Sequence, residues 1–404
     1  ISVLALAEAR ASDQLRFIIL AGLAAGFFVA SKYTGLIFAF SVGATLLFQK
    51  RWFAHGIIFG LSVVFAGGQW YGWNAFTTGD PLFPMLYGIV DYLPDTPWNQ
   101  NIHSVYKAMI DENVVPSNLL WLIIYPIKAT LFPHPDFESL RVGFGPLALL
   151  LLPFATVGVW SFRGRLLKHP LFVFGTVCLL SYSIWFLLGP SQRVRHLLPI
   201  YPLLLICFSV CAIKVAKQTP ILLRPLHAIF ALVIPLQLFG ATLFAVNYGR
   251  YIFENKNRHT FLRENIPLYD AAFEANKFLT SSDKLLVSDR QLIYLFEIPV
   301  FYANPPTQAR VSIHQHATDP RRFWSQLNEL KISHILVNFN PESESNPGSY
   351  RSMIIYLQER QCLKVVIRFN TKTFTSRTLP ALGQSRNKQG TIRKLTPNTC
   401  IYQD

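Results

Sequence analysis

The stretch LLGPSQRVRHLLPIYP, residues 187–202, places Arg193, Arg195 and His196 between two apolar runs. The first run starts near residue 170 and the second ends near residue 213. A helix that crosses a bilayer needs about 20 mostly apolar residues, and both runs approach that length. The pattern therefore predicts two membrane-buried helices joined by a short cationic turn.

The composition extends this interpretation to more than half of the chain. Of the 404 residues 51% are hydrophobic and only 15% are charged, whereas soluble domains carry about 25% charged residues. The long apolar runs lie between residues 15 and 248, and the remainder has an ordinary soluble composition. We therefore expect an α-helical polytopic membrane domain over 1–250 and a small soluble α/β domain over 251–404.

About seven segments have the composition of a membrane span. A further segment, 118–132, is short and contains Pro126 and Lys128, so we expect it to lie at the membrane interface or to dip into the bilayer. The seven predicted spans are 15–31, 33–49, 53–76, 143–161, 170–189, 196–213 and 226–248.

Basic clusters between the spans predict the orientation, because Lys and Arg concentrate in cytoplasmic loops. If three basic clusters lie on the cytoplasmic side of the membrane, then the loop 77–117, the turn 190–195 and the tail 251–404 lie on the external side. The net charge of +15 then reflects topology and contact with lipid headgroups, and no basic stripe with interleaved aromatics predicts nucleic-acid binding. The clusters are Lys50, Arg51 and His55; Arg163, Arg165, Lys168 and His169; and Lys214, Lys217 and Arg224.

Strands alternate with helices in the tail, which predicts a largely parallel sheet. Cys362 and Cys400 begin two of the candidate strands and could form a disulfide, or remain separate. The predicted helices are 267–279, 290–296, 320–330 and 349–360, and the predicted strands are 284–289, 334–339, 362–370 and 400–404.

Four ordered stretches resemble bacterial GT-C membrane glycosyltransferases, the relatives of protein O-mannosyltransferases and of the lipid A aminoarabinose transferase. They are GLAAGFFVASKYTGLIFAF (22–40), GDPLFPML (79–86), RVGFGPLALLLLP (141–153) and RVRHLLPIYPLL (193–204). The resemblance implies an inverting hexosyltransferase of the bacterial inner membrane with an external active site and an extracytoplasmic, periplasmic C-terminal domain. It also implies a polyprenyl-phosphate-linked sugar as donor and a glycan, lipid or protein of the cell envelope as acceptor.

The same resemblance assigns a lipid-phosphate site to Arg195, Arg193, Lys32 and His196, with Arg195 slightly favoured over Arg193. A guanidinium keeps its charge and matches phosphate geometry. The alternatives are that the cations snorkel to headgroups or pair with external acids, and that His196 caps a helix.

Tyr33, Trp73 and Asp80 are candidates for the substrate cleft. Trp73 could instead belong to an interfacial aromatic belt, and Asp80 in its Gly-Asp-Pro turn could bond to nearby backbone.

The catalytic base is the least determined part of the prediction. In the family this acid lies in the first external loop, and the sequence begins at Ile1 within an apolar segment. We therefore expect the base upstream of Ile1 and an incomplete N-terminal part, so that the fragment alone could be inactive, with Asp80 as a weak candidate within the chain. A divalent cation could take part, but no side chains have metal-ligand spacing.

Two other functions remain open. A lipid or glycan transporter predicts charged residues at mid-membrane and internal repeats, neither of which is evident. A non-enzymatic membrane-anchored assembly protein that presents the tail would need no base. The sequence leaves the sugar, the acceptor, metal dependence and the oligomeric state undecided.

Overall fold

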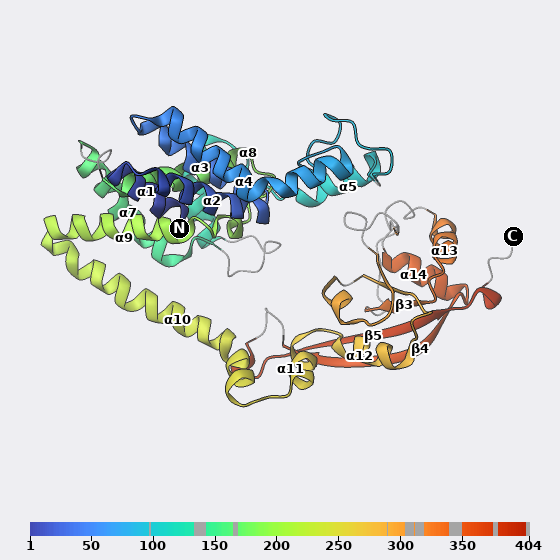
Figure 1. Cartoon of the computed structure of the whole chain (residues 1–404). Coiled ribbons are helices and arrows are strands. Elements are labelled where there is room, and N and C mark those ends of the chain that lie inside the picture. The colour runs from blue at the N-terminus through green and yellow to red at the C-terminus, as the bar shows by residue number, and fades with distance from the viewer. Residues whose placement is uncertain are drawn as a thin grey trace. The chain divides into compact units, whose positions relative to one another are not determined.

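The computed structural model describes residues 1–96, 98–132, 143–164, 169–288, 290–303, 311, 319–338, 350–374 and 379–400. The chain divides into two compact units (Figure 1). The first unit comprises Ile1–Thr96 and Met109–Gln237, and the second comprises Pro97–Ala108 and Leu238–Asp404. The longer segment of the second unit begins at Leu238, within a helix, whereas the sequence predicts a boundary at residue 250.

The first unit is helical. Its helices are α1 (Ser2–Ser12), α2 (Leu15–Ser31), α3 (Thr34–Ala44) with the 3-10 turn Thr45–Phe48, α4 (Trp52–Thr78), α6 (Leu119–Leu131), α7 (Gly145–Phe162), α8 (Leu171–Leu188) and α9 (Tyr201–Gln218). Two further helices, α5 (Gln100–Ile110) and α10 (Leu223–Phe253), have residues in both units.

Glycines allow α2 and α4 to pack closely. A Cβ atom at Gly22 would lie 2.6 Å from the carbonyl oxygen of Phe59, and one at Gly26 would lie 2.6 Å from that of Val63. On α4, a Cβ atom at Gly67 would lie 2.5 Å from the carbonyl oxygen of Gly26. Small residues one helical turn apart let two apolar helices meet backbone to backbone, which is how helices associate in lipid.

All seven predicted spans are helical, but seven membrane crossings are not confirmed. Among the described residues, four helical segments are long and apolar enough to cross a membrane: Trp52–Thr78, Leu171–Leu188, Tyr201–Gln218 and Pro220–Phe253. The helices at Leu15–Ser31, Thr34–Phe48 and Gly145–Ser161 are apolar but shorter, as is the helix of the predicted interfacial segment, Leu119–Leu131.

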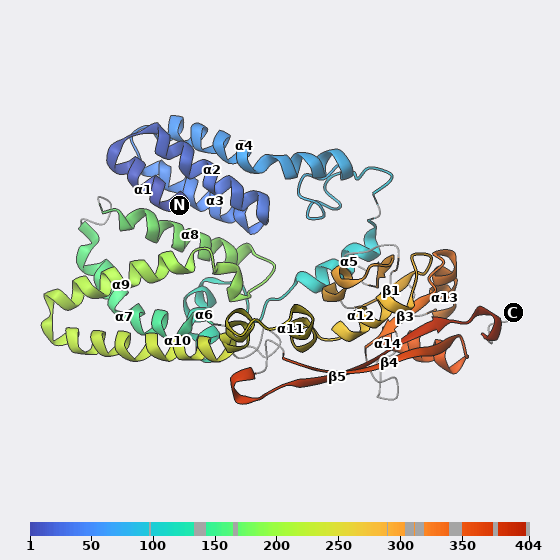
Figure 2. The same ribbon diagram turned by 60° about the horizontal axis from the view of Figure 1, so that its bottom comes forward.

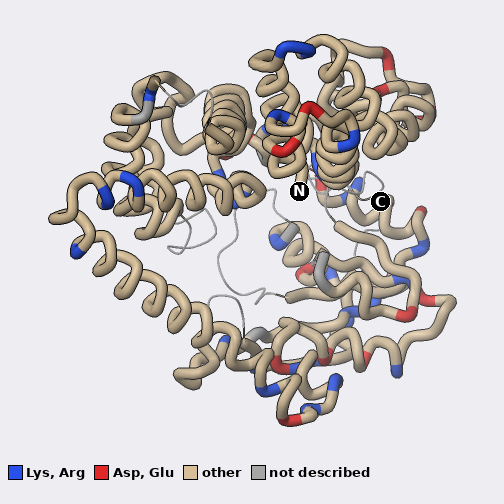
Figure 3. Tube along the Cα trace, turned by 60° about the vertical axis from the view of Figure 1, so that its left-hand side comes forward, with Lys and Arg blue, Asp and Glu red and all other residues tan. Residues whose placement is uncertain are grey.

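The outer surface of these helices is strongly apolar. Phe65 and Phe76 on α4 are 83% and 81% exposed, and α10 carries charged residues only at Arg224 and Arg250. Figure 3 shows the long uncharged tube that this leaves along α10. Contiguous apolar surface of this extent is unfavourable in water, so the helices indicate a membrane protein.

The second unit contains a five-stranded sheet in the order β2-β1-β3-β5-β4 (Figure 2). The strands are β1 (Leu285–Val287), β2 (Val300–Tyr302), β3 (His334–Val337), β4 (Leu363–Thr373) and β5 (Arg386–Leu395). The helices are α11 (Arg258–Asn265), α12 (Tyr269–Phe278), α13 (Pro320–Glu329) and α14 (Tyr350–Glu359), and the predicted helix 290–296 is a 3-10 helix, Arg290–Leu295.

The sheet is mixed, so the prediction of a largely parallel sheet is wrong. β1 pairs in parallel with β2 and β3, whereas β5 pairs antiparallel with both β3 and β4. The sequence RNKQGTIRKL of β5 is mainly polar and was not recognised as a strand. Two strands that follow one another in the chain with no helix long enough for a crossover between them pair antiparallel, which the pattern of alternating elements does not reveal. The predicted strand 400–404 lies outside the described residues after Cys400.

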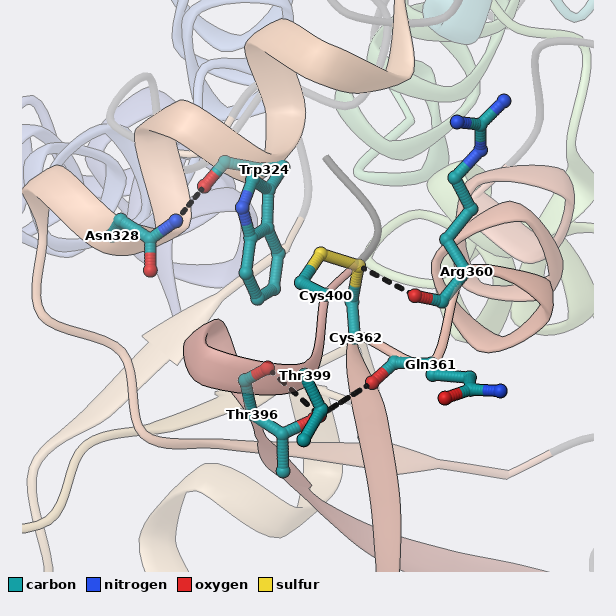
Figure 4. Close-up of a disulfide and its surroundings, with 8 residues drawn as sticks. All are labelled: Trp324, Asn328, Arg360, Gln361, Cys362, Thr396, Thr399 and Cys400. Atoms are coloured by element: carbon teal, nitrogen blue, oxygen red, sulfur yellow. Dashed lines mark hydrogen bonds between the residues drawn. A yellow bond between two sulfur atoms is a disulfide. The ribbon is translucent and has the colours of Figure 1, made fainter. Parts of the chain in front are cut away.

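A disulfide joins Cys362 and Cys400 across a separation of 38 residues (Figure 4). Both cysteines are buried in a core cluster with Phe323, Trp324 and Met353. The bond therefore links the start of β4 to the segment after β5. The free cysteines Cys178, Cys207 and Cys211 lie in α8 and α9.

Candidate functional site

Three connections meet at one end of the helical unit. They are the link between α2 and α3, the loop that follows α4, and the link between α8 and α9. The Tyr33 hydroxyl donates to the Phe83 carbonyl at 2.6 Å, and Lys32 reaches His196. Residues 112–115 join the same end through contacts with Ser191, Gln192 and Arg193. The predicted phosphate-binding residues are thus brought together.

The contact between Lys32 and His196 assigns a chemical role to each. The Lys32 Nζ atom lies 3.2 Å from His196 Nδ1. Because an ammonium group only donates hydrogen bonds, Nδ1 must accept, and the ring proton of a neutral His196 then resides on Nε2. His196 is therefore a hydrogen-bond donor oriented by a lysine.

Burial and neighbouring cations keep His196 neutral. Desolvation, together with the charges of Lys32, Arg195 and Arg193, lowers the pKa of His196 to about 4, against a smaller opposing effect of Glu112. Three cations and one carboxylate give the cluster a net charge of +2. An anion bound here would be stabilised by the same charges that disfavour the imidazolium.

The two arginines have different surroundings. Arg193 forms an ion pair with Glu112, and both side chains are about one-fifth exposed. Ser191 Oγ donates to Glu112 Oε2 at 2.6 Å, which fixes the carboxylate. Arg195 is the more exposed of the two. Glu112 thus holds Arg193 in place.

Gln192 fixes the backbone that carries both arginines. Its side chain is fully buried and accepts from the backbone N–H groups of Val114 and Val115 at 2.9 and 3.0 Å. Its Nε2 donates to the Val115 carbonyl at 2.8 Å, and the Tyr125 hydroxyl donates to the Gln192 carbonyl. Buried polar groups satisfied in this way give a rigid turn.

Asp80 organises the loop that follows α4. It is fully buried, and its carboxylate accepts from the backbone N–H groups of Leu82 and Leu86 and from the Tyr92 hydroxyl at 2.9 Å. Burial and this carboxylate raise the pKa of Tyr92 above its ordinary value. Both Asp80 oxygens are engaged inside the loop, which is the turn role that the sequence also allowed.

Tyr33 and Trp73 do not have equivalent positions. Tyr33 is partly buried, and its hydroxyl accepts from Asn74 Nδ2 at 3.1 Å in addition to its bond to Phe83. Trp73 lies next to Asn74 on α4 but is 59% exposed, whereas Asn74 is buried. Tyr33 therefore belongs to the site, and Trp73 has the exposure of an interfacial aromatic residue.

An apolar groove of about 770 Å³ lies among α6, α7, α8 and α9. Leu197, the residue after His196, and Ile200 line one part of it, and Trp160 and Arg163 line another. Most of the other lining residues on α6, α7, α8 and α9 are apolar, among them Leu152 and Phe208. A hydrocarbon chain would be a suitable occupant of this surface.

The predicted cytoplasmic clusters lie at the other ends of these helices. Lys214 Nζ lies 2.8 Å from His169 Nε2, which joins the second and third clusters. His55 contacts Gln49 and lies 4.0 Å from Asp13. Arg165 and Lys168 lie outside the described residues. The helical unit thus has a second lysine–histidine contact, remote in sequence from the first.

The sequence did not identify Glu112 and Gln192 as parts of this cluster. Glu112 is one of several acids in the loop 77–117, and its contact with Ser191 spans 79 residues. No sequence signal specifies such a pair. Among the described residues, no group of three or more His, Cys, Asp or Glu side chains could hold a metal ion.

The fold and the site define a protein with a unit of apolar, membrane-length helices that carries a cationic cluster at one end, and with a second unit built on a mixed sheet. No protein-family model matches the chain, and no curated protein or solved structure matches it either.

Proposed function

We propose that the chain belongs to a membrane glycosyltransferase that uses a polyprenyl-phosphate-linked sugar. The observation that carries the proposal is the convergence of Lys32, His196, Arg193 and Arg195 from two helix connections onto one cationic cluster. Such a cluster matches a lipid phosphate at the membrane surface. The adjacent apolar groove is suited to the polyprenyl chain.

The cluster would act on the leaving group. When the bond between the sugar and the phosphate oxygen breaks, negative charge develops on the phosphate. Lys32, Arg195 and the Nε2–H group of His196 would stabilise that charge, with Arg193 held nearby by Glu112. The acceptor hydroxyl would attack the opposite face of the sugar, which inverts the anomeric carbon, and would pass its proton to a general base. Asp80 and Glu112 are both engaged in hydrogen bonds, so neither is assigned as that base.

The test is binding of undecaprenyl phosphate to the detergent-solubilised protein, measured by native mass spectrometry. Lys32→Ala and Arg195→Ala should each weaken binding roughly 10- to 100-fold, because a hydrogen bond to a charged group contributes about 1.5–3 kcal/mol.

Lys214→Ala is the matched control, because it removes a lysine that also contacts a histidine, but at the other end of the helices. It should bind undecaprenyl phosphate as the unmodified protein does. Equal losses in Lys32→Ala and Lys214→Ala, or no binding by any variant, would refute the proposal and favour the assembly-protein alternative.

A further inference from the structure

The last part of the second unit has an unusual charge distribution. Residues 360–403 contain nine Lys or Arg residues and no Asp or Glu. Residues 238–359 of the same unit contain twelve of each sign. The excess positive charge is thus confined to the segment that forms the β4–β5 hairpin, which makes the hairpin a candidate surface for an anionic partner.

The hairpin is long, and its cations are accessible. Its ladder runs from the pair Leu363–Leu395 to the pair Thr373–Arg386, which corresponds to about 35 Å at 3.3 Å per residue. Leu363 and Leu395 are buried beside the disulfide, so that end is anchored in the core. Five cations along the ladder are exposed: Lys364, Arg368, Lys372, Arg386 and Lys394.

The far end of the hairpin packs beside α11. The Phe374 N–H group donates to the Glu264 carbonyl at 2.5 Å, and Thr371 Oγ1 lies 3.5 Å from Asp270 Oδ2 on α12. Helix α11 begins at Arg258, five residues after Phe253 ends α10. The ribbon in Figure 2 accordingly reaches from the α14 side of the sheet to α11. The hairpin end therefore lies close to the point where a membrane-length helix ends.

An exposed apolar residue accompanies the cations at this end. Leu382, in the 3-10 turn between the strands, is 63% exposed, and Lys372 and Arg386 flank the turn. Ile252 and Phe253 at the end of α10 are exposed as well. Cations that surround an exposed apolar side chain are typical of segments that lie on anionic bilayers.

We propose that the hairpin tip, defined as Lys372, Leu382 and Arg386, docks on anionic lipid headgroups where α10 leaves the bilayer. The cations contact lipid phosphates, and Leu382 enters the interface. This inference rests on α10 crossing the membrane and not on sugar transfer. The nearness of the tip to α11 and the exposure of Leu382 favour a lipid surface over a soluble polyanion.

The test uses the full chain in lipid nanodiscs, with a fluorophore attached to Leu382→Cys and quenchers carried on the lipid headgroup region. Phosphatidylglycerol discs should quench the probe, and phosphatidylcholine discs should quench it much less. High salt should remove the difference, since screening weakens headgroup contacts. The unmodified protein, labelled in the same way, gives the background from the native cysteines.

A second experiment reverses the charge of the two cations at the hairpin tip. Lys372→Glu/Arg386→Glu should lower the docked-to-undocked ratio roughly 30-fold or more, because each basic residue near such a surface contributes roughly fivefold. Arg321→Glu/Arg322→Glu on α13 is the matched control, with the same change in charge at two exposed arginines, and should leave quenching unchanged.

Three results would overturn the proposal. The first is equal quenching in both lipids, and the second is quenching that survives reversal of Lys372 and Arg386. The third is a probe that responds to added dextran sulfate but not to phosphatidylglycerol, which would assign the tip to a soluble polyanion. The salt dependence is measured on the Leu382→Cys chain alone, so a folding defect in the reversal variant cannot produce a false result.

Discussion

At the scale of the residue, the contact between Lys32 and His196 gives the site a dependence on pH. His196 has a pKa of about 4 in the folded protein, whereas an unperturbed histidine has a pKa of about 6.5. Between these values the unfolded chain binds the proton and the folded chain does not. Stability linked to His196 is therefore present above pH 6.5 and is lost as the pH falls from there toward 4.

This linkage predicts a specific result for His196→Asn, which keeps a side-chain acceptor but does not titrate. Thermal unfolding of the unmodified protein should shift to lower temperature between pH 7 and pH 5, and the variant should shift less. Lys32→Gln removes the nearest cation, so it should raise the pKa of His196 and also reduce the shift. Identical pH shifts in all three proteins would exclude His196 as the titrating group.

The cationic residues of the site could be predicted from the sequence, but the residues that contact them could not. Lys32, Arg193 and Arg195 could be predicted to lie at one end of the helices because each lies between two apolar runs, and runs of this kind alternate in direction. Glu112 and Gln192 could not be predicted, since neither periodicity nor composition encodes a contact between residues nearly eighty positions apart.

At the scale of the element, glycines in α2 and α4 allow these two helices of the first unit to pack closely. Gly26→Val should force the two helices apart and destabilise the unit by about 1–3 kcal/mol, the usual cost of overpacking. Gly60→Val on α4 is the control, because a Cβ atom there meets nothing within 4 Å. Thermal stability in detergent should fall for the first variant and not for the second.

The helices could be located from the sequence better than the strands. In lipid, an apolar run of 15 or more residues forms an α-helix, because every backbone polar group must be hydrogen-bonded within the segment. Three predicted spans, 15–31, 33–49 and 143–161, are helical within a few residues of their predicted bounds, but these helices are shorter than the four of membrane length. β2 has three residues, which is too short a run to identify a strand, and β5 is mainly polar, so it lacks the apolar pattern of a buried strand.

At the scale of the whole molecule, the two units have separate cores, so they should respond separately to loss of the disulfide. A closed loop of 38 residues corresponds to about 4 kcal/mol of stabilisation in the chain-entropy description. Cys362→Ala/Cys400→Ala should therefore increase hydrogen exchange in α14, β4 and β5 while the helices of the first unit remain protected.

Cys211→Ala, which removes a free cysteine on α9, is the control for that measurement and should leave the exchange of β4 and β5 unchanged. Loss of protection in both units of the double variant would mean that they unfold together. Unchanged exchange throughout would mean that the disulfide contributes little to the folded state.

The position of β5 between β3 and β4 has a consequence for biosynthesis. β4 is translated first, yet the strand that pairs with it is made later. A nascent chain that has emerged only as far as β4 exposes two open edges, on β3 and on β4, which are templates for aggregation. A premature stop codon before Arg386 would make that condition permanent, so nonsense variants in this region should be cleared by proteolysis although every helix is intact.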